Sequence, residues 1–291
     1  MSKINEIKKF EFRSDLPNEI ELLSLKELFE KGKEVLTSPH RAGFYHILWF
    51  QSGSSTHLVD FIPVDIKSNS ILFLSKDTVH RFDEKGNFEG KALLFTDNFF
   101  CKTEEDVKYL QHSSLFYNLF SVSQIAAGDD QSAIPQLFQL IEKELKNKKD
   151  SFQSDILRNT LFNLLLQSER ENLRHESKHS KKNADFDCVL MFKDSLEIHF
   201  KEQKQVSFFA NQLSITEKRL NRATKSILGK TTKQVIDERV LLEAKRILAH
   251  STESIKEIGY YLGFEEPSNF VKYFRKHQHR TPSAFRAQLK F

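Results

Sequence analysis

The segment 206–285 contains the same pattern twice, and this repeat constrains the fold more than any other feature of the chain. Each copy has a short amphipathic helix, a small residue in its middle, another small residue four positions later, and a second helix rich in basic and amide side chains. The small pair is Ala210 and Ser214 in the first copy and Gly259 and Gly263 in the second. A small residue lets helices cross closely, and glycine tolerates the left-handed backbone of a turn. The repeat therefore predicts two helix-turn-helix units.

Local signals mark where the second helix of each copy begins. Thr216 is suited to the N-cap position in the first copy. Pro267 suits the first turn of its counterpart, where a missing N–H does no harm. A longer helix with apolar residues at helical spacing is expected over about 233–250, between the two copies. Another is expected over 186–200, where the second domain begins.

The segment 210–286 resembles the DNA-binding domain of AraC/XylS-type transcription regulators, which holds two helix-turn-helix units joined by a long central helix. Three positions depart from the family pattern: Thr224 replaces the usual Phe, Gly259 the usual Ala, and His279 the usual Gly. The first departure is expected to weaken packing under the first reading helix, and the last to remove an easy left-handed turn. The elements that carry the resemblance occur in order: Ala210, Leu213, Leu220, Arg222, Gly229, Arg239, Ala244, Ile255, Ile258, Gly263-Phe264, Ser268, Phe270, Phe274-Arg275-Lys276, Thr281-Pro282 and Phe285-Arg286.

The resemblance also implies which side chains touch DNA, because the family reads base edges from three positions of each reading helix. These positions are held by Lys218, Asn221 and Arg222 in the first unit, and by Pro267, Ser268 and Lys272 in the second. Arginine can pair with guanine and asparagine with adenine, so the first unit is expected to supply most sequence discrimination. Two reading helices roughly 34 Å apart would enter successive major grooves. The candidate phosphate contacts, which position without specifying, are Lys225, Arg275, Lys276 and Thr281.

The distribution of charge supports a nucleic-acid partner. Residues 185–291 hold 19 Lys and Arg against 13 Asp and Glu, a net charge of +6. Residues 1–184 hold 25 against 27, a net charge of −2. The basic excess therefore lies in the part that contains the repeat, as phosphate binding requires.

The first part of the chain reads as a small β-domain. A strand near 7–12 and a short helix near 25–31 are expected, followed by an aromatic strand at 44–50, a turn at 51–55 and a second strand at 57–61. Further short strands are expected at 64–66, 70–74 and 90–95, so the segment predicts a small barrel or sandwich.

Residues 40–95 also resemble the cupin-like effector domain that precedes the DNA-binding domain in many AraC-type regulators. The most recognisable part is the run from Leu74 to Phe82. An effector pocket lined by aromatic side chains is one interpretation, and burial of the same side chains in the core is the alternative. The candidate pocket residues are Phe44, Tyr45, Trp49 and Phe61.

Helical periodicity begins near residue 131 and continues in a second helix from about residue 152. Apolar residues cover more of the second helix than one packing face requires, which favours a homodimer seam over two layers packed on the barrel. The hydrophobic pattern then disappears, so a linker is expected. The predicted architecture is a two-domain α+β fold with a cupin-like sensor (1–125), a helical dimerisation segment (126–172), a linker (173–184) and an all-α DNA-binding domain (185–291).

Composition and motifs exclude several other classes. The mean hydropathy of −0.49, with no apolar run near the roughly 20 residues that span a bilayer, argues against a membrane protein. Residues 1–6 lack the apolar core of a signal peptide, so a cytoplasmic location is expected. Cys101 and Cys188 lie far apart and are expected to be reduced thiols. No phosphate loop, nucleophile elbow or Cys-x-x-Cys pair occurs, and the spacing of His57 and His80 does not assemble a metal ligand set. We therefore expect no catalytic residue, metal or cofactor.

The resulting prediction is a regulator that binds double-stranded promoter DNA, responds to a small-molecule effector, and activates transcription by RNA polymerase as a homodimer. Two alternatives stay open at this point. One is an architectural DNA binder whose first domain only dimerises, and the other is a cupin-type metalloenzyme fused to a DNA-targeting domain.

Overall fold

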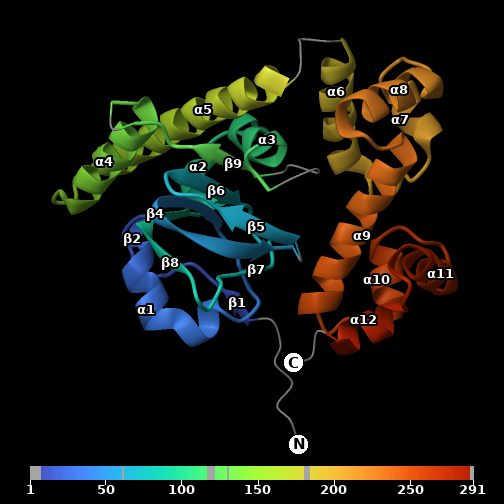
Figure 1. The fold of residues 1–291 in the computed structure, drawn as a ribbon, viewed down its shortest axis with the longest axis horizontal. Helices are drawn as coiled ribbons and strands as arrows, with labels where there is room; N and C mark the ends of the chain where they lie inside the picture. The colour runs from blue at the N-terminus through green and yellow to red at the C-terminus, as the bar shows by residue number, and fades with distance from the viewer. Residues whose placement is uncertain (1–7, 61, 117–121, 130, 180–183, 289–291) are drawn as a thin grey trace, which may run out of the picture. The chain divides into compact units, whose positions relative to one another are not determined.

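The computed structural model describes residues 8–60, 62–116, 122–129, 131–179 and 184–288. The described residues divide into two compact units, of which one spans Lys9–His179 and the other holds residues 184–288. The first unit is a sheet with helices and the second is helical (Figure 1). This arrangement confirms the predicted two-domain α+β fold. No helix in the described ranges is long and apolar enough to cross a membrane.

The first unit is organised around one long strand, β4 (Tyr45–Val59). It pairs antiparallel with β6 (Ser70–Leu74) and β8 (Asn87–Phe95) through its first part, and with β5 (Ile62–Ile66) and β7 (His80–Arg81) towards its end. Because it changes partners along its length, the sheet curls around it, as in a cupin-like domain. The remaining strands are β1 (Lys8–Phe10), β2 (Ile20–Ser24), β3 (His40–Ala42) and β9 (Gln124–Ala126).

The predicted turn at 51–55 is wrong, because these residues continue β4. Gly53 has a φ of 85°, and the register against β8 shifts between Phe50 and Ser52. Such an irregularity is a β-bulge, which bends a strand without ending it. A bulge and a turn both favour glycine and serine, so the polar run alone does not distinguish them.

Alternate residues of β4 face two different cores. Tyr45, Ile47 and Trp49 pack in a cluster with residues of α4 (Ala133–Lys146) and α5 (Gln153–His179). Leu48 and Phe50 belong to the opposite cluster, which also contains residues of α1 (Leu25–Leu36). Two short helices, α2 (Asp97–Phe100) and α3 (Glu104–His112), complete the unit. Figure 1 shows α4 and α5 on one side of the sheet and α1 on the other.

Helix α5 extends through 173–179, the first part of the segment predicted as a linker. The apolar period ends there, but polar contacts continue. Asn172 is buried, and its Nδ2 donates to Ser114 Oγ at 3.0 Å. Arg174 pairs with Glu171 at 2.5 Å, at the i,i+3 spacing that stabilises helices.

The second unit contains the two helix-turn-helix copies. The first copy is α7 (Val206–Gln212) and α8 (Glu217–Leu228), and the second is α10 (Ile255–Tyr261) and α11 (Pro267–Gln278). The connecting helix α9 (Thr232–His250) separates them, and α6 (Ala184–His199) and α12 (Pro282–Gln288) flank the set. The predicted repeat is thus observed helix by helix.

Left-handed residues occur at matching places in the two copies. The turns contain Ser214 and Gly263, with φ of 54° and 72°. Gly229 and His279 end the reading helices, with φ of 67° and 55°. His279 therefore makes the left-handed turn that glycine makes in the first copy, at a strain of about 1–2 kcal/mol for a residue with a side chain.

Contacts within this unit connect the copies to each other. The backbone of Lys201, in the loop after α6, lies so close to Gly263 that a Cβ there would meet the Lys201 carbonyl oxygen at 1.9 Å. Lys201 Nζ also donates to the hydroxyl of Tyr261 at 2.6 Å. On α9, Asp237 Oδ1 accepts a 2.7 Å hydrogen bond from the hydroxyl of Tyr273 in the second reading helix. These bonds fix the second reading helix to the frame that carries the first.

Candidate nucleic-acid interface

Helix α8 presents one apolar face and one basic face. Leu220, Ala223 and Thr224 are buried beneath it. The hydroxyl of Thr216 accepts from the backbone N–H of Arg219 at 3.1 Å, which confirms the predicted N-cap. An N-cap bond satisfies one of the free N–H groups at a helix start and so sets where the basic face begins.

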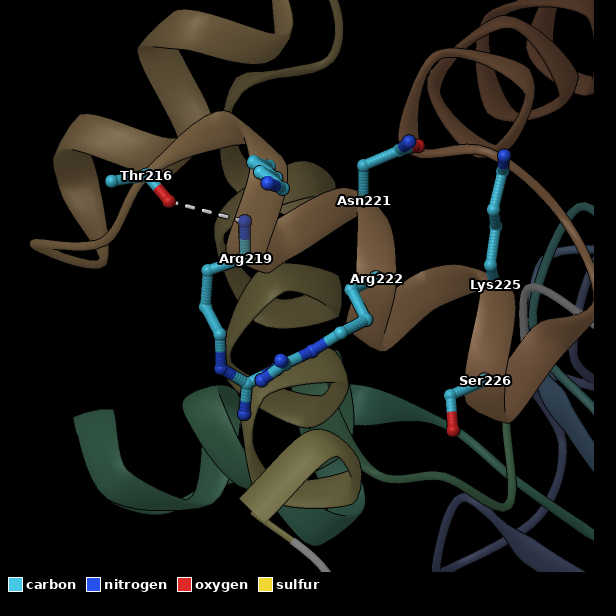
Figure 2. A pocket seen from close by; sticks show the side chains of 7 residues that line it. Thr216, Arg219, Asn221, Arg222, Lys225 and Ser226 are labelled. Carbon is cyan, nitrogen blue, oxygen red and sulfur yellow. Dashed lines mark hydrogen bonds between the residues drawn. The ribbon is translucent and has the colours of Figure 1, made fainter.

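The outer face of α8 is hollowed over about 700 Å³. Figure 2 shows its side chains, with Arg219 and Arg222 extending towards each other and Lys225 pointing away. Four cationic groups on one open surface suit a polyanion better than a small neutral ligand. The lining residues are Thr216, Lys218, Arg219, Asn221, Arg222, Lys225 and Ser226.

The four cations divide into one anchor and three available groups. Arg219 forms an ion pair with Asp185 and donates to the carbonyl of Ala184 at 3.0 Å, so it ties α8 to α6. Lys218, Arg222 and Lys225 are exposed and make no hydrogen bond or ion pair with their side chains in the part of the chain that the structure describes. Of these three, Lys218 and Arg222 are predicted base readers and Lys225 is a predicted phosphate contact.

Asn221 has a structural contact that the sequence did not reveal. Its Oδ1 accepts from the backbone N–H of Thr232, the first residue of α9, at 3.1 Å. The neighbouring Thr224 hydroxyl lies 3.1 Å from the hydroxyl of Thr232. These two bonds join the reading helix to the start of α9. Thr224, the first of the three departures from the family pattern in the sequence, thereby makes a buried polar contact.

The second reading helix exposes fewer groups that can read bases. Ser268 and Lys272 are exposed, whereas Pro267 is half-buried at the first position of α11. Arg275 and Lys276 are exposed near its end. A further predicted phosphate contact, Thr281, is half-buried, and its hydroxyl accepts from Ala284 N at 3.2 Å as the cap of α12.

The predicted effector-pocket residues do not lie together. A cavity of about 330 Å³ in the first unit is lined by Phe44. Tyr45 and Trp49 point to the opposite face of β4, where Trp49 Nε1 donates to Asn69 Oδ1 at 3.2 Å. They are core residues, as the alternative held, because adjacent strand residues face opposite sides. Phe61 lies outside the described residues.

Three histidines line this cavity and a fourth lies against one of them, a cluster that sequence spacing did not predict. His40, His46 and His80 line it, and His57 Nε2 lies 3.0 Å from His80 Nδ1. They come from β3, β4 and β7, which neighbour one another only after folding. Among the described residues, no group of three or more His, Cys, Asp or Glu side chains is arranged to hold a metal ion.

Comparisons with known proteins match the segment that carries this basic surface. Residues 209–288 match the family model described as a helix-turn-helix domain, which covers both copies. The chain is 23% identical to the HTH-type transcriptional activator RhaS of Escherichia coli over 259 residues, 85% of this chain and 86% of the relative. RhaS of Citrobacter koseri is 24% identical over 249 residues, 81% of this chain and 83% of the relative. Among solved structures, ToxT from Vibrio cholerae is 12% identical with a TM-score of 0.44, covering 94% of this chain and 98% of its own.

Proposed function

We propose that this chain is a transcription regulator of the AraC/XylS type, which binds promoter DNA in a sequence-specific manner and activates transcription. The observation that carries the proposal is the exposed basic face of α8, where Lys218, Arg222 and Lys225 have no partner among the described residues. Unpaired cations on a capped helix can contact phosphates and base edges without first breaking an ion pair.

The two copies would divide the work. Arg222 in the first copy can donate two parallel hydrogen bonds to a guanine, which discriminates bases by about 1–3 kcal/mol. The second copy offers Ser268, Lys272, Arg275 and Lys276, whose chemistry suits phosphate attachment more than base reading. Asn221 would position the first reading helix against α9 and would not read a base, because its side-chain oxygen already accepts a hydrogen bond from Thr232 N–H.

Selection of bound sequences from a random DNA library at physiological salt tests this function. The proposal predicts a directional motif with two blocks about one helical turn apart. Recovery of motif-free, salt-sensitive binding by the full chain and also by residues 185–291 alone would contradict it and favour the architectural alternative.

The first unit would supply a homodimer contact through α5. Ile156, Leu166 and Leu173 are 45%, 46% and 47% exposed. Their spacings of ten and seven residues place them along one side of the helix. A second copy of the chain would cover this apolar face, and the dimer would present paired DNA-binding units to a promoter.

Light scattering tests the dimer. Leu166→Glu should halve the measured mass, because it would bury a charge in the seam. Lys108→Glu on α3 is an exposed change on another helix and should leave the mass unchanged. A monomeric wild-type chain would contradict the seam. Recruitment of RNA polymerase and response to an effector complete the proposed role of an activator.

A further inference from the structure

The cavity in the first unit is an apolar pocket with a polar side. Its volume of about 330 Å³ lies at the lower end of the range for small-molecule sites, roughly 300–1,000 Å³. Half of its lining residues are Phe10, Phe44, Leu48, Phe82, Leu94 and four residues of α1, and Phe12, Leu23 and Ala42 add further apolar surface. A compact apolar molecule therefore fits it better than a sugar or a nucleotide.

The polar side is the histidine cluster, with His80 at its centre. The ring of His80 lies 4.3 Å from that of His40, 5.1 Å from that of His46 and 5.2 Å from that of His57, measured between centroids. His40 and His80 are each 3% exposed as residues, and His57 is 1% exposed. His46 is partly exposed, although its Nδ1 is buried.

Three ring nitrogens of this cluster are buried without a partner among the described residues, and two of them belong to His46 and His80, which line the cavity. His46 Nδ1, His57 Nδ1 and His80 Nε2 are buried and have no hydrogen-bond partner in the described part of the chain. His40 Nδ1 lies 2.9 Å from the carbonyl oxygen of Ser38. A carbonyl can only accept, so His40 Nδ1 carries the proton and Nε2 is an acceptor. Buried polar atoms without partners are costly, and a bound polar group would relieve that cost.

The charge around the pocket selects against an anion. Burial lowers the pKa of all four rings, and neighbouring histidines lower it further for His46, His57 and His80. The pKa falls to about 3 for His46 and His57. The rings are thus neutral at pH 7 and offer no positive charge. At the rim, Arg13 is already paired with Asp15 at 2.8 Å and with Glu21 at 3.1 Å. Glu11 adds another carboxylate to the lining.

We propose that this pocket binds an uncharged, compact and mainly apolar molecule whose hydroxyl group hydrogen-bonds to the histidine cluster. A hydroxyl can donate to one ring nitrogen of the cluster that acts as an acceptor, such as His40 Nε2, and accept from a buried ring N–H of His46 or His80 that is unpaired within the described ranges. The apolar body of the ligand supplies the van der Waals contacts that the wall of an empty cavity lacks. The role of this pocket as an effector site rests on the proposed regulator function. The binding of the ligand does not rest on that function.

Three adamantane probes of similar shape test the chemistry: adamantanol, adamantane and adamantanecarboxylate. Binding is measured as the rise in the thermal midpoint of the full chain, followed by fluorescence of Trp49, the one tryptophan of the sequence. Trp49 lies in the core of the first unit, so its signal reports this unit. Adamantanol should bind about tenfold more tightly than adamantane, the gain expected for a hydrogen bond to a buried unpaired group. The carboxylate should produce no rise.

Two variants locate the site. His40→Phe and His46→Leu should each reduce the preference for adamantanol over adamantane to about twofold or less, because each removes a polar partner. Tyr45→Phe, on the opposite face of the same strand, should leave the preference unchanged. Using two histidine variants keeps the test informative if one of them does not fold.

Other outcomes would overturn the assignment. Equal affinity for the alcohol and the hydrocarbon would show that the histidines do not contact the ligand. A rise with adamantanecarboxylate alone would assign an anion site, and a rise with Zn²⁺ but no probe would assign a metal site. If adamantanol binds but leaves DNA affinity unchanged, the pocket chemistry stands and effector control fails. If no probe binds while the DNA motif is recovered, the pocket assignment fails and the regulator function stands.

Discussion

Replacing Gly263 with alanine should destabilise the DNA-binding unit more than the same change at Gly229. Both glycines are left-handed, with φ of 72° and 67°, so both alanines incur about 1–2 kcal/mol of backbone strain. At Gly229 no described atom outside its immediate chain neighbours lies within 4 Å of the new Cβ. At Gly263 the new Cβ would lie 1.9 Å from the carbonyl oxygen of Lys201, so the loop after α6 must retreat. Overpacking of this kind adds about 1–3 kcal/mol, which gives a total of roughly 2–5 kcal/mol.

Thermal unfolding of the full chain followed by two signals measures the difference. Far-UV circular dichroism reports the helices of both units, whereas Trp49 fluorescence reports the sheet unit alone and should not shift in either variant. A loss seen by circular dichroism without a shift of the Trp49 signal therefore comes from the helical unit. For a domain of this size, each kcal/mol corresponds to roughly 4–8 °C in the midpoint. Equal losses for Gly229→Ala and Gly263→Ala would refute the inference that the loop after α6 supports the second turn.

Three further results are expected. Because burial lowers the pKa of His46 and His57 to about 3, the unfolded chain takes up protons near pH 6.5 while the folded unit does not. The free energy of unfolding of the sheet unit, measured by denaturant titration of Trp49 fluorescence, should therefore fall between about pH 6.5 and 3, by up to about 1.4 kcal/mol per pH unit for each histidine. A pH-independent value would contradict burial of neutral rings. Asn221→Ala should lower the free energy of unfolding by about 1 kcal/mol, because it removes the hydrogen bond to Thr232, and should weaken binding to all DNA sequences alike. In a binding assay, loss of preference at a single base would instead make Asn221 a base reader. Thr216→Ala removes an N-cap and should lower the free energy of unfolding by about 1 kcal/mol, seen as a lower thermal midpoint by circular dichroism. An unchanged midpoint would contradict the cap.

The sequence predicted the DNA-binding unit well because its determinants are local. Small residues at fixed spacing, the Thr216 cap and Pro267 in the first turn each act within a few residues of chain. Helical periodicity then identified the flanking helices, since one face of each is apolar. The repeat made each copy a check on the other.

The sheet unit and its pocket were harder to predict because their determinants are distant in sequence. β4 reads as two strands until its partner β8 is known to pair across the bulge at Phe50 and Ser52. The histidine cluster forms because β3 and β7 pair at His40 and His80, and no spacing rule joins residues forty positions apart. Asn221 looks like a reading residue from its place on α8, and only the fold shows its bond to Thr232.

The most direct test of the account compares the DNA motifs selected by Arg222→Ala and Lys272→Ala. Both variants remove one exposed cation that has no partner among the described residues, so they are matched in charge. The account predicts that Arg222→Ala abolishes the preference in one block of the motif, whereas Lys272→Ala lowers affinity for every sequence and leaves both blocks intact. A motif that is unchanged by Arg222→Ala, or a block erased by Lys272→Ala, would contradict the claim that the first helix-turn-helix unit reads the sequence and the second holds the backbone.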